Sequence, residues 1–257
     1  MIDHATLERL KTMRLAGMAD AFVELLSMTG DKPLATPDII KLAVDREWDR
    51  RQDSKQHRLR KTAGLAQPHA DIGDVRVLPG RDLDLDLIRR LAVGNYLSQR
   101  QDVILQGPTG AGKTYIACAL GNKACQQHKT VRYLRAADLF DQISLAEKTG
   151  TRADLFAKLV RLDLLILDDW FLARPTRPQV EHLHSLIDRR TRVGSTIFCP
   201  QLSPDQWHDR IEEKVFADAI VDRVTTNAHA TTLDCRDSMR RLIDPGPVSP
   251  VTPNLRE

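Results

Sequence analysis

The chain has 257 residues, with 38 lysines and arginines against 35 aspartates and glutamates, 42% apolar residues and four cysteines. This composition excludes a wholly disordered chain, and the length fits one large domain or a core domain with a small appendage. The sequence has no apolar stretch long enough to cross a membrane and no secretory signal, so we expect a cytoplasmic protein without a membrane partner. The net charge of +3 does not by itself indicate a nucleic-acid partner.

The N-terminal part of the chain shows helical spacing of its apolar residues. One helical pattern runs from Leu7 to Leu26, and a second begins near Pro37 and continues into a charged run that ends near Lys61. We therefore expect a small all-helical domain over residues 1–70. A further short amphipathic helix is predicted over residues 83–97.

From residue 102 onward, short apolar runs alternate with helical patterns. The predicted strands are Asp102–Gln106, Val131–Arg135, Leu164–Asp168, Ser195–Cys199 and Ala230–Asp234, and the clearest helices between them are Lys113–Gln127 and Gln179–Val193. This alternation predicts an α/β domain over residues 71–244, with a parallel five-stranded sheet flanked by helices. The proline-rich residues 245–257 are predicted to be a disordered tail.

A phosphate-binding motif follows the first of these strands. Its residues are Gly107, Pro108, Thr109, Gly110, Ala111, Gly112, Lys113 and Thr114, which match G-x-x-x-x-G-K-[ST], and Tyr115 comes directly after them. Glycines let backbone N–H groups converge on phosphates, while the lysine and the threonine hydroxyl serve the terminal phosphates and Mg²⁺. The alternative is an incidental glycine-rich turn, which the apolar strand before the motif and the helix after it disfavour. We predict an ATP site with Mg²⁺.

Two acidic residues end the strand predicted at residues 164–168. Four apolar residues precede Asp168 and Asp169, so both acids lie at the carboxyl edge of the sheet, where the phosphate loop also lies. We assign Asp168 to the Mg²⁺ shell and Asp169 to polarising the attacking water. Asp169 is one methylene shorter than the glutamate that many ATPases carry there, so we expect slow basal hydrolysis that depends on assembly or a partner.

The sequence resembles the IstB-like helper ATPases of insertion sequences, which belong to the AAA+ ATPases and are related to the DnaC-type helicase loaders. The likeness extends over residues 5–243. The motifs that carry it are the phosphate loop with the helix after it, Gly17–Ala19, Val44–Trp48, Asp163–Trp170, Ser195–Ile197, Gln201–His208, Ala217–Arg223 and Ser238–Arg241.

This resemblance implies three further roles. Gln201 matches the polar sensor that follows the next strand, Arg223 matches the arginine that reaches the γ-phosphate of a neighbouring subunit, and Arg240 matches a second nucleotide-sensing arginine. A guanidinium suits the charge that develops on a transferring phosphoryl group, although each arginine could instead form a surface ion pair. Two residues depart from the family pattern: Pro200 stands directly before the sensor, and Phe171 stands where glycine is common.

A basic segment near the end of the N-terminal helices is the candidate DNA contact. Residues 46–61 hold seven lysines and arginines against three acids, a local net charge of +4. The alternative is a solvated helix face with pairs such as Glu47–Arg51, and the family resemblance favours DNA or transposase contact. The candidate residues are Arg46, Arg50, Arg51, Lys55, Arg58, Arg60 and Lys61.

Three functions fit the motifs. The favoured one is an ATP-dependent helper that assembles as a homo-oligomer with inter-subunit ATP sites on double-stranded DNA and recruits or activates a cognate transposase. A DnaC-like loader of a replicative helicase would use the same ATPase. A small-molecule kinase would need a lid that binds the phosphate acceptor, and the sequence shows no sign of one.

Overall fold

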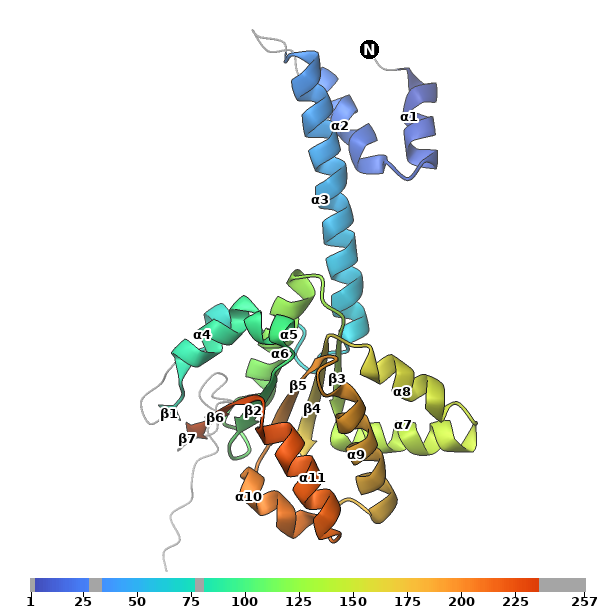
Figure 1. Ribbon diagram of the computed structural model, residues 1–257. Coiled ribbons are helices and arrows are strands. Elements are labelled where there is room, and N and C mark those ends of the chain that lie inside the picture. The colour runs from blue at the N-terminus through green and yellow to red at the C-terminus, as the bar shows by residue number, and fades with distance from the viewer. Residues whose placement is uncertain (1–2, 28–33, 77–80, 236–257) are drawn as a thin grey trace, which may run out of the picture. The chain divides into compact units, whose positions relative to one another are not determined.

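The computed structural model describes residues 3–27, 34–76 and 81–235 (Figure 1). The chain divides into two compact units, residues 1–58 and 59–257. The helical pattern predicted from Leu7 to Leu26 is divided into α1 (His4–Thr12) and α2 (Ala16–Ser27), and the second predicted helix is α3 (Thr36–Ala63), which runs past the unit boundary. Arg240 and the predicted tail 245–257 lie outside the described residues. Within the described ranges, no helix is long and apolar enough to cross a membrane.

The first unit is held together by small buried side chains and one buried carboxylate. Ala19 and Ala21 of α2 and Ala43 of α3 are almost fully buried, and alanine lets two helices approach closely. Glu47 of α3 is also buried and accepts a hydrogen bond from the Gly17 backbone N–H of α2 at 2.9 Å. The two sequence segments that resemble the insertion-sequence family here, 17–19 and 44–48, are therefore the two sides of one helix contact.

The second unit contains the predicted α/β sheet. Its strands are β2 (Asp102–Gln106), β3 (Val131–Arg135), β4 (Leu164–Trp170), β5 (Ser195–Pro200) and β6 (Ala228–Thr232). They pair in the order β3-β4-β5-β2-β6, and every pairing is parallel. The predicted five-stranded parallel sheet is thus confirmed, and the carboxyl ends of all five strands meet at one edge.

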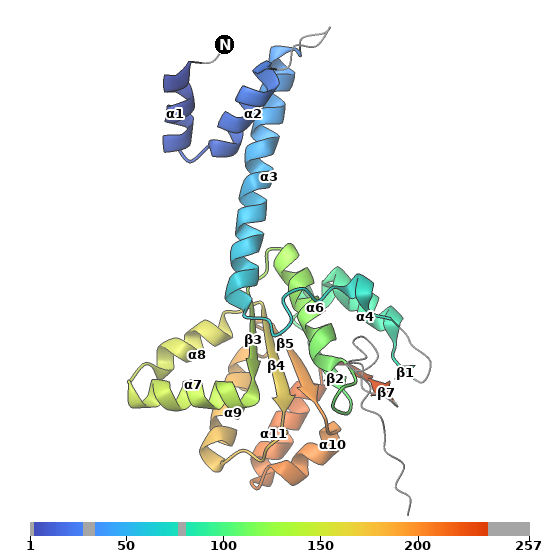
Figure 2. The same ribbon diagram turned by 180° about the vertical axis from the view of Figure 1, so that it is seen from behind.

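Helices cover both faces of this sheet (Figures 1 and 2). On one face, α4 (Leu85–Val93), α5 (Asn95–Gln99) and α6 (Lys113–Gln126) share a core with Val103, Leu105 and Ile166. On the other face, α7 (Ala136–Lys148), α8 (Arg152–Val160), α9 (Arg177–Arg190), α10 (Pro204–Trp207) and α11 (Lys214–Thr225) pack on Ile104 and Leu165. Adjacent residues on one strand enter opposite cores, as the two-residue period of a strand requires.

Two further predicted elements differ from the structure. The helix predicted over residues 83–97 is interrupted at Gly94, whose φ of +92° ends α4, and α5 begins one residue later. The last predicted strand is shifted, because β6 spans Ala228–Thr232 and the chain then forms β7 (Asp234–Cys235) against β1 (Arg81–Asp82). Short 3₁₀ turns also occur at η1 (Ile72–Asp74) and η2 (His208–Arg210).

A partly buried carboxylate at the start of β2 makes stability depend on pH. The Asp102 carboxylate accepts a hydrogen bond from the Thr196 backbone N–H at 2.6 Å, and burial raises the pKa of Asp102 to about 7. Between the unfolded pKa of about 4 and the folded value, the folded state holds a proton that the unfolded state has released. Stability from this group is therefore greatest at low pH and is lost as the pH rises towards 7.

We expect the free energy of unfolding to fall by roughly 1–2 kcal/mol from pH 5 to pH 7.5 because of Asp102. Urea unfolding across this range measures the change. The control is Asp102→Asn, which keeps an oxygen for the Thr196 N–H and removes the titration, so its stability profile should be flatter by that amount. Identical profiles for the two proteins would contradict the assignment.

Candidate nucleotide site

The phosphate loop connects β2 to α6 at the carboxyl edge of the sheet. Gly107 has a φ of +156°, and a Cβ there would lie 2.2 Å from the Leu233 carbonyl oxygen, so only glycine fits this close approach. The Gly107 N–H donates to the Pro200 carbonyl oxygen at 3.3 Å, which joins the loop to the end of β5. Gly112, with a φ of +92°, is the last residue before α6. The N-terminal end of α6 therefore lies next to the loop, as in a phosphate site.

Lys113 lies in this loop as predicted. Its Nζ donates to the carbonyl oxygens of Gly107 and Pro108 at 2.7 and 2.9 Å, and only 7% of the residue is exposed. Burial lowers the pKa of Lys113, while the nearby Cys199, Asp168 and Asp169 raise it. The Lys113 ammonium group is thus held beside the loop, where it could contact a bound phosphate chain.

Asp168 ends the regular part of β4 and is surrounded by hydrogen-bond donors. Its Oδ2 accepts from the Thr114 hydroxyl and from the Tyr133 hydroxyl, each at 2.7 Å, and its Oδ1 accepts from the Asp169 N–H at 2.9 Å. A hydroxyl oxygen beside a carboxylate is the donor set that Mg²⁺ prefers, so Thr114 and Asp168 fit the metal role that the sequence predicts. Burial and the hydrogen bond to Asp168 raise the pKa of Tyr133 well above its ordinary value.

Asp169 lies in the irregular part of β4. The pairing of β4 with β5 is irregular between Asp168 and Trp170, and Asp169 has a φ of +55°. Its carboxylate is half-exposed and lies 3.9 Å from the Arg135 guanidinium. Phe171 also adopts a left-handed conformation, with a φ of +52°, at the position where the family often has glycine. Buried aromatic rings of Trp170, Phe198 and Trp207 pack around this turn.

The sensor region follows β5. Pro200 is the last residue of that strand, and its carbonyl oxygen accepts the Gly107 hydrogen bond described above. Pro200 has no backbone N–H to donate, but its carbonyl oxygen still connects β5 to the phosphate loop through this hydrogen bond. Gln201 comes next and is partly buried. The Tyr115 hydroxyl accepts a hydrogen bond from the Asp71 N–H at 3.3 Å, so its contact is with the segment before β1.

Arg223 is not near the phosphate loop of its own chain. It lies in the last turn of α11, and its guanidinium pairs with Asp188 of α9 at 2.8 Å. The chain then turns into β6, with the Asn227 carbonyl oxygen accepting from the N–H of Asp102, the first residue of β2. The phosphate loop follows the last residue of β2, so Arg223 and Lys113 lie towards opposite edges of the sheet.

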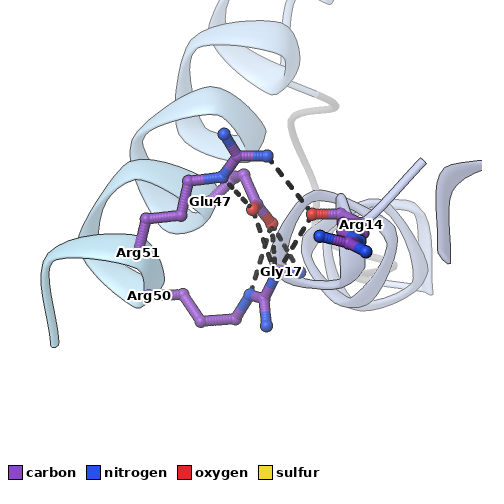
Figure 3. Close-up of polar contacts among 5 residues, drawn as sticks. All are labelled: Arg14, Gly17, Glu47, Arg50 and Arg51. Carbon is purple, nitrogen blue, oxygen red and sulfur yellow. Dashed lines mark hydrogen bonds and ion pairs between the residues drawn. The ribbon is translucent and has the colours of Figure 1, made fainter. Parts of the chain in front are cut away.

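Three of the candidate DNA-binding residues take part in ion pairs within the first unit. Arg50 and Arg51 both contact the buried Glu47 carboxylate, at 3.1 and 2.7 Å, and both reach the Arg14 carbonyl oxygen (Figure 3). Burial is the largest single effect on the pKa of Glu47, and it raises this pKa. The hydrogen bonds from Arg50, Arg51 and the Gly17 N–H together outweigh burial and lower the pKa to about 2. Arg46 pairs with Glu24. The Glu47–Arg51 pair that the sequence suggests as an alternative to DNA contact is therefore present.

The remaining candidates lie further along α3. Lys55, Arg58, Arg60 and Lys61 are all exposed. Trp48 is also exposed. Exposed basic side chains are the groups that contact a polyanion.

Two residues at this edge were missed by the sequence reasoning. Tyr133 and Arg135 lie two positions apart near the end of β3, and β3 pairs with β4 so that Arg135 stands opposite Asp168. Their place near the end of a predicted strand could have indicated them, because the ends of neighbouring parallel strands meet at one edge of the sheet. Nothing in the residue types alone distinguishes Tyr133 from an ordinary core tyrosine.

Comparisons with known proteins agree with this geometry. A family model described as IstB-like ATP binding protein matches residues 8–243. A putative insertion sequence ATP-binding protein of Sinorhizobium fredii is 38% identical over 245 residues, 94% of this chain and 98% of the relative. A putative insertion sequence ATP-binding protein of Pseudomonas fluorescens is 39% identical over 202 residues, 79% of this chain and 87% of the relative.

Solved structures show the same fold at low sequence identity. AMPPCP-bound DnaA from Aquifex aeolicus has a TM-score of 0.57 at 21% identity, covering 70% of this chain and 54% of DnaA. A DnaC helicase loader has a TM-score of 0.56 at 16% identity, covering 64% of this chain and 96% of the loader. The chain therefore belongs to the IstB-like ATP-binding proteins, which are built on the P-loop fold of the AAA+ ATPases.

Proposed function

We propose that this protein is a Mg²⁺-dependent ATPase that assembles on double-stranded DNA and recruits or activates the transposase of an insertion sequence. The observation that carries the proposal is the convergence of Lys113, Thr114 and Asp168 at one edge of the sheet, with Asp169 beside them. The relatives described as insertion sequence ATP-binding proteins support the biological setting.

The residues of the site divide the chemistry between them. Lys113 binds the β- and γ-phosphates, and backbone N–H groups of the loop cradle them. Thr114 and Asp168 would hold Mg²⁺, which would supply positive charge beside the terminal phosphoryl group during its transfer. Asp169 orients and polarises the attacking water, and Gln201 lies on the loop that follows the neighbouring strand. The half-exposed carboxylate of Asp169 is accessible to such a water.

The position of Arg223 supports completion of the site by a second subunit. Its own phosphate loop lies towards the other edge of the sheet, and its guanidinium is only partly exposed beside Asp188. An arginine placed this way serves a neighbouring copy of the chain better than its own nucleotide. The ATP site then lies between subunits, and hydrolysis depends on assembly.

Contact with DNA is assigned to the exposed basic residues of α3, chiefly Lys55, Arg60 and Lys61. Each side chain that neutralises a phosphate makes binding weaken as salt rises. Arg46, Arg50 and Arg51 contribute less, because their ion pairs with Glu24 and Glu47 already use the guanidinium groups.

The decisive experiment measures assembly on DNA. Sedimentation of the full chain with duplex DNA should give a large complex with Mg²⁺ and ATP, and free protein with ADP or without nucleotide. Lys113→Ala is the matched control and should stay unassembled in all three conditions. Raising the salt from about 50 to 200 mM should weaken the complex at least tenfold.

Two outcomes would contradict the proposal. One is the same sedimentation pattern whether or not nucleotide and DNA are present. The other is a stable ATP-dependent complex with a replicative helicase and none with DNA or a transposase, which would favour the DnaC-like alternative. Transposases encoded beside the gene are the partners to test first.

A further inference from the structure

The buried Tyr133 makes a contact that the proposed chemistry does not yet use. Its hydroxyl donates to Asp168 Oδ2 at 2.7 Å, the same oxygen that accepts from the Thr114 hydroxyl at 2.7 Å. Tyr133 is 8% exposed and Asp168 is 4% exposed, so water has little access to either group. The tyrosine comes from β3, whereas the threonine comes from α6.

We propose that Tyr133 is a positioning residue for the metal site, fixing the Asp168 carboxylate in the rotamer that serves Mg²⁺. This inference rests on the proposed Mg²⁺ role of Thr114 and Asp168. Oδ1 of the carboxylate is fixed by the Asp169 N–H at 2.9 Å, and Oδ2 is fixed by two hydroxyls from different elements. With Thr114 assigned to the metal, the Tyr133 hydrogen bond is the contact that holds Oδ2 from outside the set of metal ligands.

A simple packing role for Tyr133 predicts something different. The aromatic ring belongs to the core on the α6 face of the sheet, and that contact requires no hydroxyl. A tyrosine hydroxyl can be buried in this fold without a hydrogen bond, since the buried Tyr96 hydroxyl has no hydrogen-bond partner among the described residues. The hydroxyl of Tyr133 is instead directed at the carboxylate assigned to the metal. The loss of a residue that hydrogen-bonds to a metal ligand typically changes the metal affinity 10–100-fold.

The test is the Mg²⁺ dependence of nucleotide binding, measured with a fluorescent ATP analogue and the full chain. In Tyr133→Phe we expect the Mg²⁺ concentration for half-maximal binding enhancement to rise about tenfold. Affinity in the presence of EDTA should change by less than about twofold, because the Tyr133 hydroxyl donates to Asp168 and not to the groups assigned to the phosphates. Tyr96→Phe is the matched control, a buried hydroxyl removed away from the site, and should keep the wild-type Mg²⁺ dependence.

A double-mutant cycle locates the effect at Asp168. In an Asp168→Asn background, Tyr133→Phe should cause no further change in Mg²⁺ dependence, because the carboxylate that it positions is gone. If Tyr133→Phe does not fold, 4-fluorophenylalanine at position 133 fills the space of the hydroxyl without donating, while 4-aminophenylalanine keeps a donor. The amino analogue should retain the wild-type Mg²⁺ dependence and the fluoro analogue should lose it.

The possible results separate this inference from the proposed function. Equal Mg²⁺ dependence in the wild type and Tyr133→Phe would overturn the positioning role and leave the metal site intact. An equal loss of nucleotide affinity with and without Mg²⁺ would also overturn it, because that pattern describes a damaged pocket. Wild-type protein that binds nucleotide without any response to Mg²⁺ would overturn the metal site and the role of Tyr133 together.

Discussion

Replacing Arg223 with alanine is expected to lower the rate of ATP hydrolysis about 10³-fold while nucleotide affinity stays within a few-fold of the wild type. The guanidinium does not reach its own phosphate loop, and it pairs with Asp188 on α9 instead. Removing it should therefore leave binding to the subunit's own loop unchanged and remove the charge that stabilises the transition state in the next subunit. Steady-state hydrolysis with saturating duplex DNA, together with ATP binding by the unassembled protein, checks both parts.

A mixing experiment distinguishes this action between subunits from a folding defect. Arg223→Ala keeps an intact phosphate loop, and Lys113→Ala keeps an intact Arg223, so neither variant alone should hydrolyse ATP. Mixed assemblies contain interfaces with both groups present and should recover part of the activity. Asp188→Asn serves as a further control, because it weakens the same ion pair without removing the guanidinium. Full activity of Arg223→Ala alone would refute the role in a neighbouring site.

Replacing Asp169 with asparagine is expected to lower hydrolysis about 10²–10³-fold with little change in ATP affinity. Asparagine is nearly isosteric but cannot accept a proton from the attacking water. Asp169 lies outside the phosphate loop and interacts with Arg135 at 3.9 Å, so the loss should appear in kcat and not in binding. A single-turnover assay on DNA-bound protein measures the chemical step directly.

The matched control for Asp169→Asn is the same substitution at Asp163, the residue directly before β4. Asp163 accepts hydrogen bonds from the Thr130 N–H and hydroxyl at 2.8 and 2.7 Å, and an asparagine there keeps an acceptor oxygen. Asp163→Asn should therefore hydrolyse ATP at close to the wild-type rate. If Asp169→Asn does the same, another group activates the water and the assignment is wrong.

The sheet was predictable because its residues are patterned locally. Apolar runs such as residues 164–167, buried on both faces, mark the parallel strands, and the glycine pattern at 107–112 marks the loop between the first strand and α6. The wrong prediction of one continuous helix over residues 83–97 has the same local origin. Gly94 can sit inside a helical pattern or end a helix, and only its φ of +92° in the folded chain decides between the two.

The contacts of the site residues depended on which strands become neighbours. Tyr133 and Asp168 are 35 residues apart, and their hydrogen bond exists because β3 and β4 pair in one particular register. The same applies to Glu47, which the sequence shows only as one acid in a basic segment. The spacing within α3 indicates a Glu47–Arg51 pair, but the burial of the Glu47 carboxylate against Gly17 of α2 is not visible in α3 alone.

The aromatic rings at the end of β4 have a practical consequence. Trp170 directly follows Asp169, is fully buried, and lies 5.9 Å from Trp207 between ring centroids. The third tryptophan, Trp48, is 63% exposed in the other unit. The tryptophan fluorescence of a Trp48→Phe chain would therefore come from these two rings alone, and one of them is the neighbour of the residue assigned to activate water. The protein carries an intrinsic optical probe at the end of β4, so any response of this turn to nucleotide can be followed in time without an added label.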